Sequence, residues 1–330
     1  MKEKAKKLLA DRSKTIPIIS YPVSRLAGIN IKDMVTLPEA QAKAMKFFAD
    51  NYPAGAVFNM MDLSVEAEAF GSKVRIENDR IPEVDGTLIS DIKEAEGLKI
   101  PPVSGRCRAF IDGVRSAVKQ IGNIPVFCGA IGPFSLACRL FGMTELMMEC
   151  FDNPESVAVL LEKCTKFITE YISALKNAGA DGILLCEPAA GLLSPDMADE
   201  FSFPFVRKIF NDVSDSDFIT GYHNCGASVS EMTDSLCSIN ADIYHFGNAA
   251  DIAKLIPLLP ESSIIAGNLD PLLFKLECGS VIESAIEKLY EECGKFSNFI
   301  LSTGCDVPPD IIAANLDIYF SKARIFGKEQ

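Results

Sequence analysis

The sequence DFITGYHNCG, at residues 217–226, decides the fold class of this chain and indicates its chemistry. The run at residues 217–220 is typical of a buried strand, and residues 227–232 have the composition of the first turns of a helix. Between them, His223 and Cys225 lie two residues apart in a glycine-flanked turn. From such a turn both side chains can point toward one ion. The stretch therefore predicts a strand-to-helix connection that carries metal-binding groups.

The same pattern returns about eighty residues later, at LSTGCD, residues 301–306. An apolar strand is again followed by glycine, and Cys305 stands where the strand stops. His223, Cys225 and Cys305 would make a soft three-ligand site, and catalytic zinc commonly has three protein ligands and one open position. Two alternatives stay open. The histidine alone suits a hydrogen-bonded structural role, and the two cysteines could form a redox pair, although no Cys-x-x-Cys motif is present.

Composition indicates an ordinary globular enzyme, with 330 residues of which 48% are apolar and 23% charged. No Pro/Gly/Ser-rich linker interrupts the chain, so we expect one domain over residues 1–330 with an N-terminal helical extension. The basic segment at residues 1–12 has no apolar signal core, and no apolar run approaches the ~20 residues of a membrane span. We therefore expect a cytoplasmic protein without a membrane partner. The net charge of -13 argues against a nucleic-acid partner.

The cysteines and histidines limit the kinds of metal site. Two histidines exclude a three-histidine site, and His245 lies at an apolar position within a predicted strand, where we interpret it as structural. Eleven cysteines without paired spacing predict reduced thiols in a cytosolic chain. Nine of the eleven lie in or beside apolar patterns and are expected to act as small buried hydrophobes. They are Cys107, Cys128, Cys138, Cys150, Cys164, Cys186, Cys237, Cys278 and Cys293.

Predicted strands and helices alternate along the whole chain. The predicted strands are Thr15–Ser20, Ala56–Met61, Pro125–Ala130, Asp181–Cys186, Asp217–Thr220, Asp242–Gly247, Ser263–Gly267 and Phe299–Ser302. They are continuously apolar, which is typical of a sheet buried on both faces. About eight such units favour an α/β fold of the (β/α)8 TIM-barrel class over an open doubly wound sheet. No Gly-x-Gly-x-x-Gly opens the first unit, which weakens a dinucleotide-binding alternative.

In such a barrel, residues just past the strands meet at the C-terminal face, where active sites lie. Six polar residues fall at such positions: Asp62, Glu187, His223, Cys225, Asn268 and Cys305. We expect Asp62 and Glu187 to contact substrate or the fourth metal position, with a hydrogen-bonded structural role as an equal alternative. Tyr222 and Asn268 are expected to line the pocket.

Two further motifs carry a family resemblance that runs from about Ile16 to the C-terminal helix. NMMDLSVEAEAFG at residues 59–71 resembles the Asp-Leu-x-Val-Glu-Ala-Glu-Ala-x-Gly stretch of zinc-dependent corrinoid methyltransferases, such as the methylcobamide:coenzyme M methyltransferases. GNLDP at residues 267–271 is similar to a segment of the wider uroporphyrinogen decarboxylase superfamily. The methyltransferase branch carries His-x-Cys and a later Gly-Cys as zinc ligands. The resemblance therefore implies His223, Cys225 and Cys305 as the ligands of Zn²⁺.

The decarboxylases of that superfamily differ at two places. Their Arg-Gln-Ala-Gly-Arg loop holds substrate carboxylates with two arginines, whereas SRLAGI at residues 24–29 keeps Arg25 and has Ile29 in the second position. They also place histidine near the last strand end, where this chain has Cys305. Asp62 matches the functional aspartate of the decarboxylases in place.

The resemblance implies methyl transfer between a corrinoid, carried by a partner protein, and a small thiol or methylated substrate that zinc activates. Either direction of transfer fits the residues. A metal-free uroporphyrinogen decarboxylase and a non-catalytic barrel that binds a tetrapyrrole or a partner protein remain the alternatives.

Overall fold

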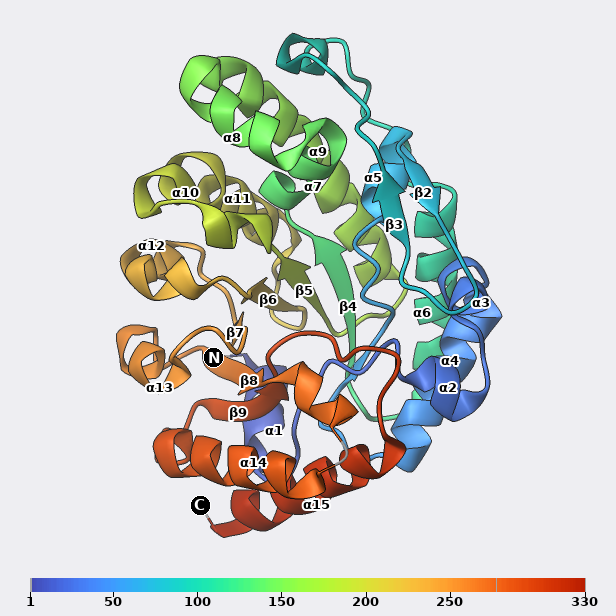
Figure 1. Cartoon of the computed structure of the whole chain (residues 1–330), viewed down its shortest axis with the longest axis vertical. Helices are drawn as coiled ribbons and strands as arrows, with labels where there is room; N and C mark the ends of the chain where they lie inside the picture. Colours follow the sequence, from blue (N-terminus) through green and yellow to red (C-terminus); the bar gives the residue numbers. More distant parts are fainter. Residues whose placement is uncertain (1, 277, 330) are drawn as a thin grey trace.

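Seven parallel strands form one curled sheet in the computed structural model, which describes residues 2–276 and 278–329. Helices surround the sheet (Figure 1), and the result is a TIM-barrel-like α/β fold, as the alternation of strands and helices predicted. The order across the sheet is β1 (Val57–Phe58), β4 (Val126–Ile131), β5 (Gly182–Cys186), β6 (Ile219–Asn224), β7 (Ile243–Phe246), β8 (Ile264–Leu269) and β9 (Phe299–Thr303). Between β1 and β4, β2 (Lys73–Arg75) and β3 (Glu83–Asp85) form a separate antiparallel hairpin.

The first helices precede β1, and the later ones lie between the strands or after the last of them. They are α1 (Glu3–Ala10), α2 (Val23–Ala27), α3 (Ile31–Thr36), α4 (Pro38–Asn51), α5 (Val65–Phe70), α6 (Arg106–Ile121), α7 (Pro133–Phe141), α8 (Met143–Asp152), α9 (Pro154–Asn177), α10 (Pro195–Phe201), α11 (Phe203–Val213), α12 (Thr233–Ser238), α13 (Ile252–Leu255), α14 (Gly279–Cys293) and α15 (Ala313–Glu329). Short 3₁₀ helices are η1 (Ile92–Ala95), η2 (Ala189–Leu192), η3 (Ala227–Glu231), η4 (Ile256–Leu258) and η5 (Pro271–Lys275). Among the described helices, none is long and apolar enough to cross a membrane.

The predicted first strand, Thr15–Ser20, is extended chain rather than a strand of the sheet. It lies between β9 and β1, where an eighth strand would close a barrel. The amide of Ile16 donates to the carbonyl of Leu301 at 3.1 Å, and the amide of Gly55 donates to the carbonyl of Thr15 at 2.7 Å. These few bonds reach both edges of the sheet without forming a continuous ladder, which is why the segment is not a strand.

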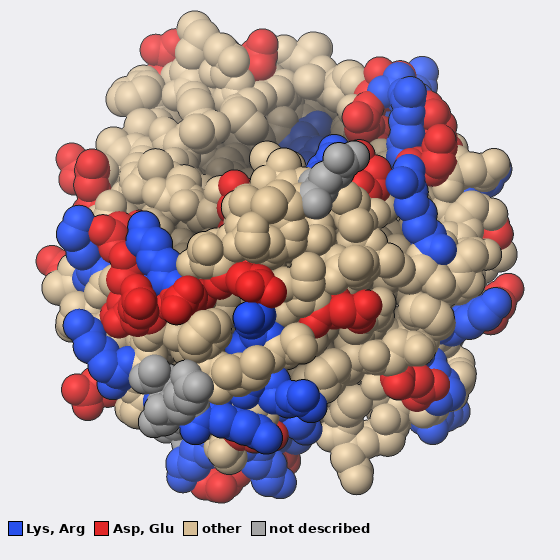
Figure 2. Space-filling model, turned by 60° about the horizontal axis from the view of Figure 1, so that its bottom comes forward, with Lys and Arg blue, Asp and Glu red and all other residues tan. Residues whose placement is uncertain are grey.

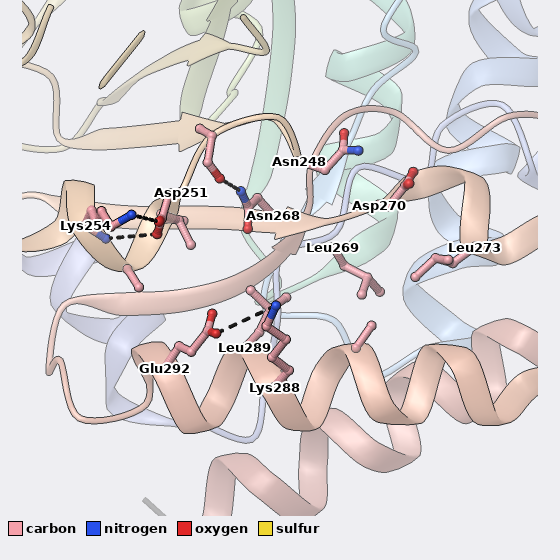
Figure 3. A pocket seen from close by; sticks show the side chains of 14 residues that line it. Asn248, Asp251, Lys254, Asn268, Leu269, Asp270, Leu273, Lys288, Leu289 and Glu292 are labelled. Carbon is pink, nitrogen blue, oxygen red and sulfur yellow. Dashed lines mark hydrogen bonds and ion pairs between the residues drawn. The ribbon is translucent and has the colours of Figure 1, made fainter. Parts of the chain in front are cut away.

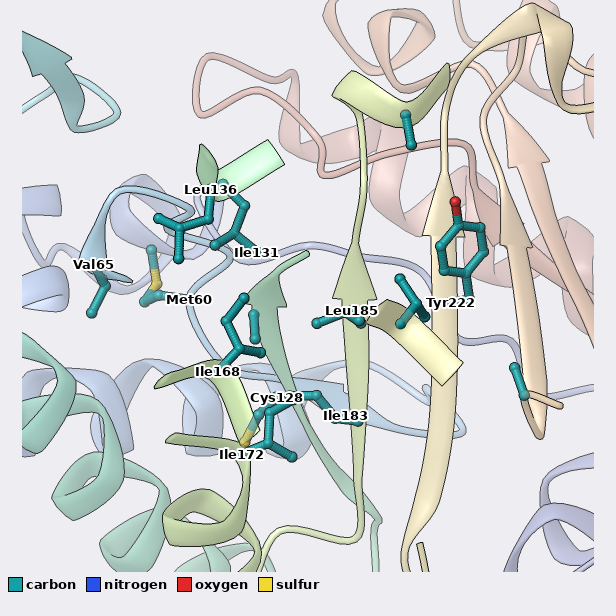
Figure 4. Close-up of a cluster of buried hydrophobic side chains, with 14 of the residues drawn as sticks. Met60, Val65, Cys128, Ile131, Leu136, Ile168, Ile172, Ile183, Leu185 and Tyr222 are labelled. Carbon is teal, nitrogen blue, oxygen red and sulfur yellow. The ribbon is translucent and has the colours of Figure 1, made fainter. Parts of the chain in front are cut away.

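Apolar side chains form two separate layers. One lies between the sheet and the surrounding helices, and Figure 4 shows part of it, where Leu185 and Ile183 of β5 lie near Ile168 and Ile172 of α9. The other fills the inside of the barrel and includes Leu8 of α1. Helix α1 therefore closes the N-terminal end of the barrel, which leaves the C-terminal end as the open one.

Salt bridges hold α1 at the N-terminal end of the barrel. Lys2 lies 2.8 Å from Asp242, just before β7, and Lys4 lies 2.6 Å from Asp181, just before β5. The expected N-terminal helical extension is thus an integral part of the barrel.

Two sets of sequence predictions need correction. Strands β6 and β8 extend further than predicted. His223 and Asn268 are therefore each the second-to-last residue of a strand, whereas we expected them just past the strand ends. The β1 strand, in contrast, has two residues only. Of the nine cysteines expected to be buried, Cys237 is half-buried and Cys278 is exposed, while the other seven are buried.

Candidate metal centre

His223 and His245 form a hydrogen-bonded pair at the C-terminal end of the sheet. Strands β6 and β7 pair in a register that sets His223 beside His245, and their Nδ1 atoms lie 2.8 Å apart. Both rings are buried. Burial lowers the pKa of His223 to about 4 and lowers the pKa of His245 well below its usual value. Both imidazoles are therefore neutral at pH 7, which is the state that binds a metal ion.

Cys225 and Cys305 lie on neighbouring loops that meet over the end of β7. A Cβ added to Gly247 would lie 2.7 Å from the Cβ of Cys225, and one added to Gly304 would lie 2.6 Å from the amide nitrogen of Asn248. Both contacts require glycine, because any larger residue would separate the loops. Residues 247 and 248 thus stand between the two cysteine-bearing loops and bring them into one region.

The thiols of this region influence one another. Burial, and then the charge of the nearby Cys225, raise the pKa of Cys305 to about 12. Burial also raises the pKa of Cys225. The pKa of Cys186, the last residue of β5 and the register partner of His223, is raised by burial and then by Cys305 and Cys225. Without a cation, all three sulfurs are protonated at neutral pH.

The three predicted ligands lie in one region, but they do not converge on one point. Within residues 2–276 and 278–329, no three His, Cys, Asp or Glu side chains are close enough together to hold a metal ion. The chemistry of the donor set nevertheless fits zinc, since it comprises one neutral imidazole and two thiols. No hydrogen bond joins the Nε2 atom of His223 to the described residues, whereas its Nδ1 atom is bonded. A coordinated thiol is deprotonated outright, so a bound divalent cation would offset the raised thiol pKa values.

Asp62 lies in a buried ionic cluster with Arg106, the first residue of α6. Its Oδ2 accepts from the Arg106 guanidinium, and its Oδ1 accepts from the amide and hydroxyl of Ser64 at 2.9 and 2.6 Å. Arg106 also reaches Glu68 at 2.5 Å. Both oxygens of Asp62 therefore have partners within the chain. A contact between Asp62 and substrate remains a prediction.

Glu187 follows β5 directly and is fully buried. Its carboxylate accepts from the backbone amides of Phe134 and Ser135, both at 2.9 Å, and from the Ser135 hydroxyl at 2.6 Å. It therefore satisfies the free amides at the N-terminus of α7. Burial raises the pKa of Glu187 to about 7. These contacts are those of the structural alternative, and a contact between Glu187 and substrate remains a prediction.

Asn268 and Tyr222 have separate positions. Asn268 donates through Nδ2 to the carbonyls of Gly247 and Ala250, at 2.9 and 2.8 Å, and thereby holds the loop after β7 on which Cys225 packs. It also lines a groove of about 630 Å³ between α13 and α14, drawn in Figure 3. Tyr222, in contrast, is fully buried in the layer between sheet and helices (Figure 4). The ring of Phe203 meets it edge-on. It does not line the mouth of the barrel, because side chains alternate along a strand and its neighbour His223 points inward.

A second cavity, of about 430 Å³, opens beside Glu187. Ser135, Arg139 and Pro188 are among its lining residues, so it lies where α7 begins and β5 ends. Figure 2 shows that one face of the molecule has a hollow with mostly uncharged walls and basic atoms in its depth. A largely apolar cleft with a few polar groups is the usual form of a small-molecule site.

Sequence reasoning missed three residues of this region. His245 was interpreted as structural, and its direct contact with His223 was not predicted. The Ser302 hydroxyl lies 2.8 Å from the Nε2 atom of His245. Arg106 donates a hydrogen bond to Asp62, which lies forty-four residues earlier in the sequence. One signal was available for His245, because a histidine in an otherwise apolar strand needs a hydrogen-bond partner.

Comparisons with known proteins show the family of this chain. The family model of uroporphyrinogen decarboxylase (URO-D) matches residues 18–325. A methylcobamide:CoM methyltransferase of Methanosarcina acetivorans is 27% identical over 297 residues, which cover 88% of this chain and 83% of that protein. A uroporphyrinogen decarboxylase of Chlorobium phaeobacteroides is also 27% identical, over 305 residues that cover 87% of this chain and 85% of that protein. Identity alone therefore does not separate the two activities.

A solved structure described as a methyltransferase from Methanosarcina mazei has the same fold. It superposes with a TM-score of 0.85 over 98% of both chains, at 21% sequence identity. At that identity the similarity is one of fold, and the side chains of the site must distinguish the activities.

Proposed function

This chain belongs to the uroporphyrinogen decarboxylase family, and we propose that within it the chain is a zinc-dependent methyltransferase. It would move a methyl group between a corrinoid, carried by a partner protein, and a small thiol or methylated substrate. The observation that carries the proposal is the donor set of His223, near the end of β6, and of Cys225 and Cys305, on loops that meet at the open end of the barrel. The 27% identical methylcobamide:CoM methyltransferase supports the same choice.

The roles of the residues follow from their chemistry. His223, Cys225 and Cys305 would hold the zinc ion, which supplies a Lewis acid that keeps a substrate thiol in its nucleophilic thiolate form. Asn268 fixes the loop after β7 and, through it, the approach of Cys225. Glu187 fixes the start of α7 beside the second cavity. Both directions of methyl transfer are compatible with this arrangement.

The decarboxylase alternative has one observation in its favour, the equal identity to a uroporphyrinogen decarboxylase. Two features oppose it. A substrate with several carboxylates needs several cations, and Ile29 stands buried where the second arginine of the decarboxylase loop would lie. The carboxylate of Asp62 is also occupied by Arg106 and Ser64.

Methyl transfer from free methylcobalamin to coenzyme M, compared with decarboxylation of uroporphyrinogen, tests the proposal. We expect thiol methylation by the wild type, its loss in Cys305→Ser, and its retention in Cys237→Ser, which changes a half-buried cysteine of α12 whose Sγ atom lies 3.6 Å from the carbonyl of Leu258. Decarboxylation by metal-free protein would overturn the proposal in favour of the alternative. Zinc binding without turnover of either substrate would favour a non-catalytic barrel.

A further inference from the structure

A chain of hydrogen bonds runs from His223 across the inside of the barrel to the backbone of the segment that precedes β1. The Nδ1 atoms of His223 and His245 lie 2.8 Å apart, and the Nε2 atom of His245 lies 2.8 Å from the Ser302 hydroxyl. That hydroxyl donates to the carbonyl of Ile16, also at 2.8 Å. All three side chains are buried, so water does not compete for these bonds.

The Ile16 carbonyl, at the far end of this chain of hydrogen bonds, sets the direction in which every group donates. A carbonyl only accepts, and Ser302 supplies the one hydrogen bond that the Ile16 carbonyl receives from the described residues. The single hydroxyl hydrogen of Ser302 is thereby used. The Nε2 atom of His245 must then carry a hydrogen and donate it to Ser302, which leaves the Nδ1 atom of a neutral His245 as an acceptor.

The other end of the hydrogen-bond chain, at His223, requires the same direction of donation. The backbone carbonyl of His245 lies 3.3 Å from the Nδ1 atom of His223, so two acceptors face that nitrogen. It must therefore carry a hydrogen. The reverse direction would leave the buried Ile16 carbonyl unpaired and would turn the lone pair of His223 Nδ1 toward a carbonyl oxygen. A doubly protonated His245 would be a buried cation with no described acid bonded to it.

We propose that His245 and Ser302 are positioning residues that hold His223 in the Nδ1–H tautomer, so that its Nε2 atom offers a lone pair to the zinc ion. Neither residue is a ligand. Metal-binding histidines commonly donate their second ring nitrogen to such a partner, and the partner fixes the tautomer and the ring orientation. The zinc-binding consequence rests on the proposed function, whereas the tautomer assignment rests on the hydrogen bonds alone.

The tautomers are directly measurable, because the chain contains two histidines only. In untagged, metal-free protein labelled with ¹⁵N-histidine, long-range ¹H–¹⁵N spectra at pH 7 should show one ring protonated at Nδ1 alone and one at Nε2 alone. In His245→Gln the remaining ring should keep its Nδ1–H, because the glutamine amide can accept from His223 and donate to Ser302. In His245→Leu the same ring should show both tautomers, because its main acceptor is lost.

Zinc affinity, measured by competition with a chromophoric chelator, gives the second readout. We expect His245→Leu and Ser302→Ala to weaken zinc binding by about 10–100-fold, and His245→Gln to stay within a few-fold of the wild type. Ser263→Ala is the matched control, since it removes another buried serine bond to a carbonyl, at 2.8 Å to Ala241, and should leave the affinity unchanged.

A His223 ring protonated at Nε2 in the wild type would overturn the inference. Equal zinc affinities for wild type, His245→Leu and His245→Gln would overturn the positioning role. A protein with the expected tautomers that binds no zinc would instead overturn the proposed metal site and leave the hydrogen-bond chain supported, so the two failures are distinguishable.

Discussion

Gly132 packs directly against the side chain of Glu187, and a Cβ added to Gly132 would lie 2.1 Å from the Cγ atom of Glu187. The carboxylate has no freedom to move aside, because Phe134 and Ser135 hold it with three hydrogen bonds. The glycine and the acid thereby join the end of β5 to the start of α7, next to the second cavity.

Gly132→Ala should therefore destabilise the protein by about 1–3 kcal/mol or more, because the added methyl group displaces a bonded, buried side chain. Urea unfolding followed by circular dichroism measures the change. Gly97→Ala is the matched control, since its Cβ would meet no atom closer than 3.8 Å, and its effect should stay within about 0.5 kcal/mol. Equal stabilities for the two variants would contradict the contact.

Glu66 should make stability depend on pH. Burial raises its pKa to about 7, and among the described residues its Oε2 atom has no hydrogen-bond partner, whereas Oε1 accepts from Ile131. The folded state thus binds more protons than the unfolded state between the ordinary carboxyl pKa and about 7. Stability conferred by this group is complete below that window and declines as the pH rises through it.

Glu66→Gln removes the charge that must be buried above that window. The variant should be close to the wild type at pH 5 and more stable by up to about 3 kcal/mol at pH 8. Because burial also raises the pKa values of Glu187 and Asp306 to about 7, the difference between variant and wild type isolates Glu66. Parallel stability curves from pH 5 to pH 8 would show that Glu66 does not titrate in this window.

Arg106 and Arg108 lie two residues apart on α6, in opposite environments. The side chains of Arg106 and its partner Asp62 are 8% and 1% exposed, whereas Arg108 pairs with Asp112 at the surface, 65% exposed. Arg106→Met should cost about 3–5 kcal/mol, because it leaves the Asp62 carboxylate buried and unpaired. Arg108→Met should cost less than about 1 kcal/mol.

The double variant Arg106→Met/Asp62→Asn checks the cause in the same unfolding measurements. It should recover part of the stability lost in Arg106→Met, because the amide removes the unpaired charge. If the double variant instead loses the sum of the stabilities lost in Arg106→Met and in Asp62→Asn alone, the effect of Arg106 comes from packing and not from its charge.

The sequence predicted the strand–helix order well, because the buried strands are largely apolar runs separated by segments with helical patterns. It predicted less about the edge of the sheet. Thr15–Ser20 has the composition of a strand, but whether a ladder forms depends on how closely both neighbours approach. The position of Tyr222 was in principle available from the alternation of side chains, since an inward His223 requires an outward Tyr222.

Contacts between residues that are far apart in the sequence could not be predicted from the apolar patterns of single strands and helices. The contact between His223 and His245 depends on the register of β6 and β7, and that of Asp62 and Arg106 on the entry of α6 beside the end of β1. Nothing local in the sequence specifies either. The close approach of the loops that carry Cys225 and Cys305 likewise depends on Gly247 and Gly304, whose roles are visible only once the loops are adjacent.

Metal content is the most direct test of the proposed site. Elemental analysis of protein purified in reducing, chelator-free buffer should find one zinc per chain, reduced strongly in His223→Ala, Cys225→Ser and Cys305→Ser and unchanged in Cys237→Ser. Wild-type protein that contains no metal under these conditions and takes up none from added zinc would contradict the account, as would variants of all three residues that keep the full zinc content.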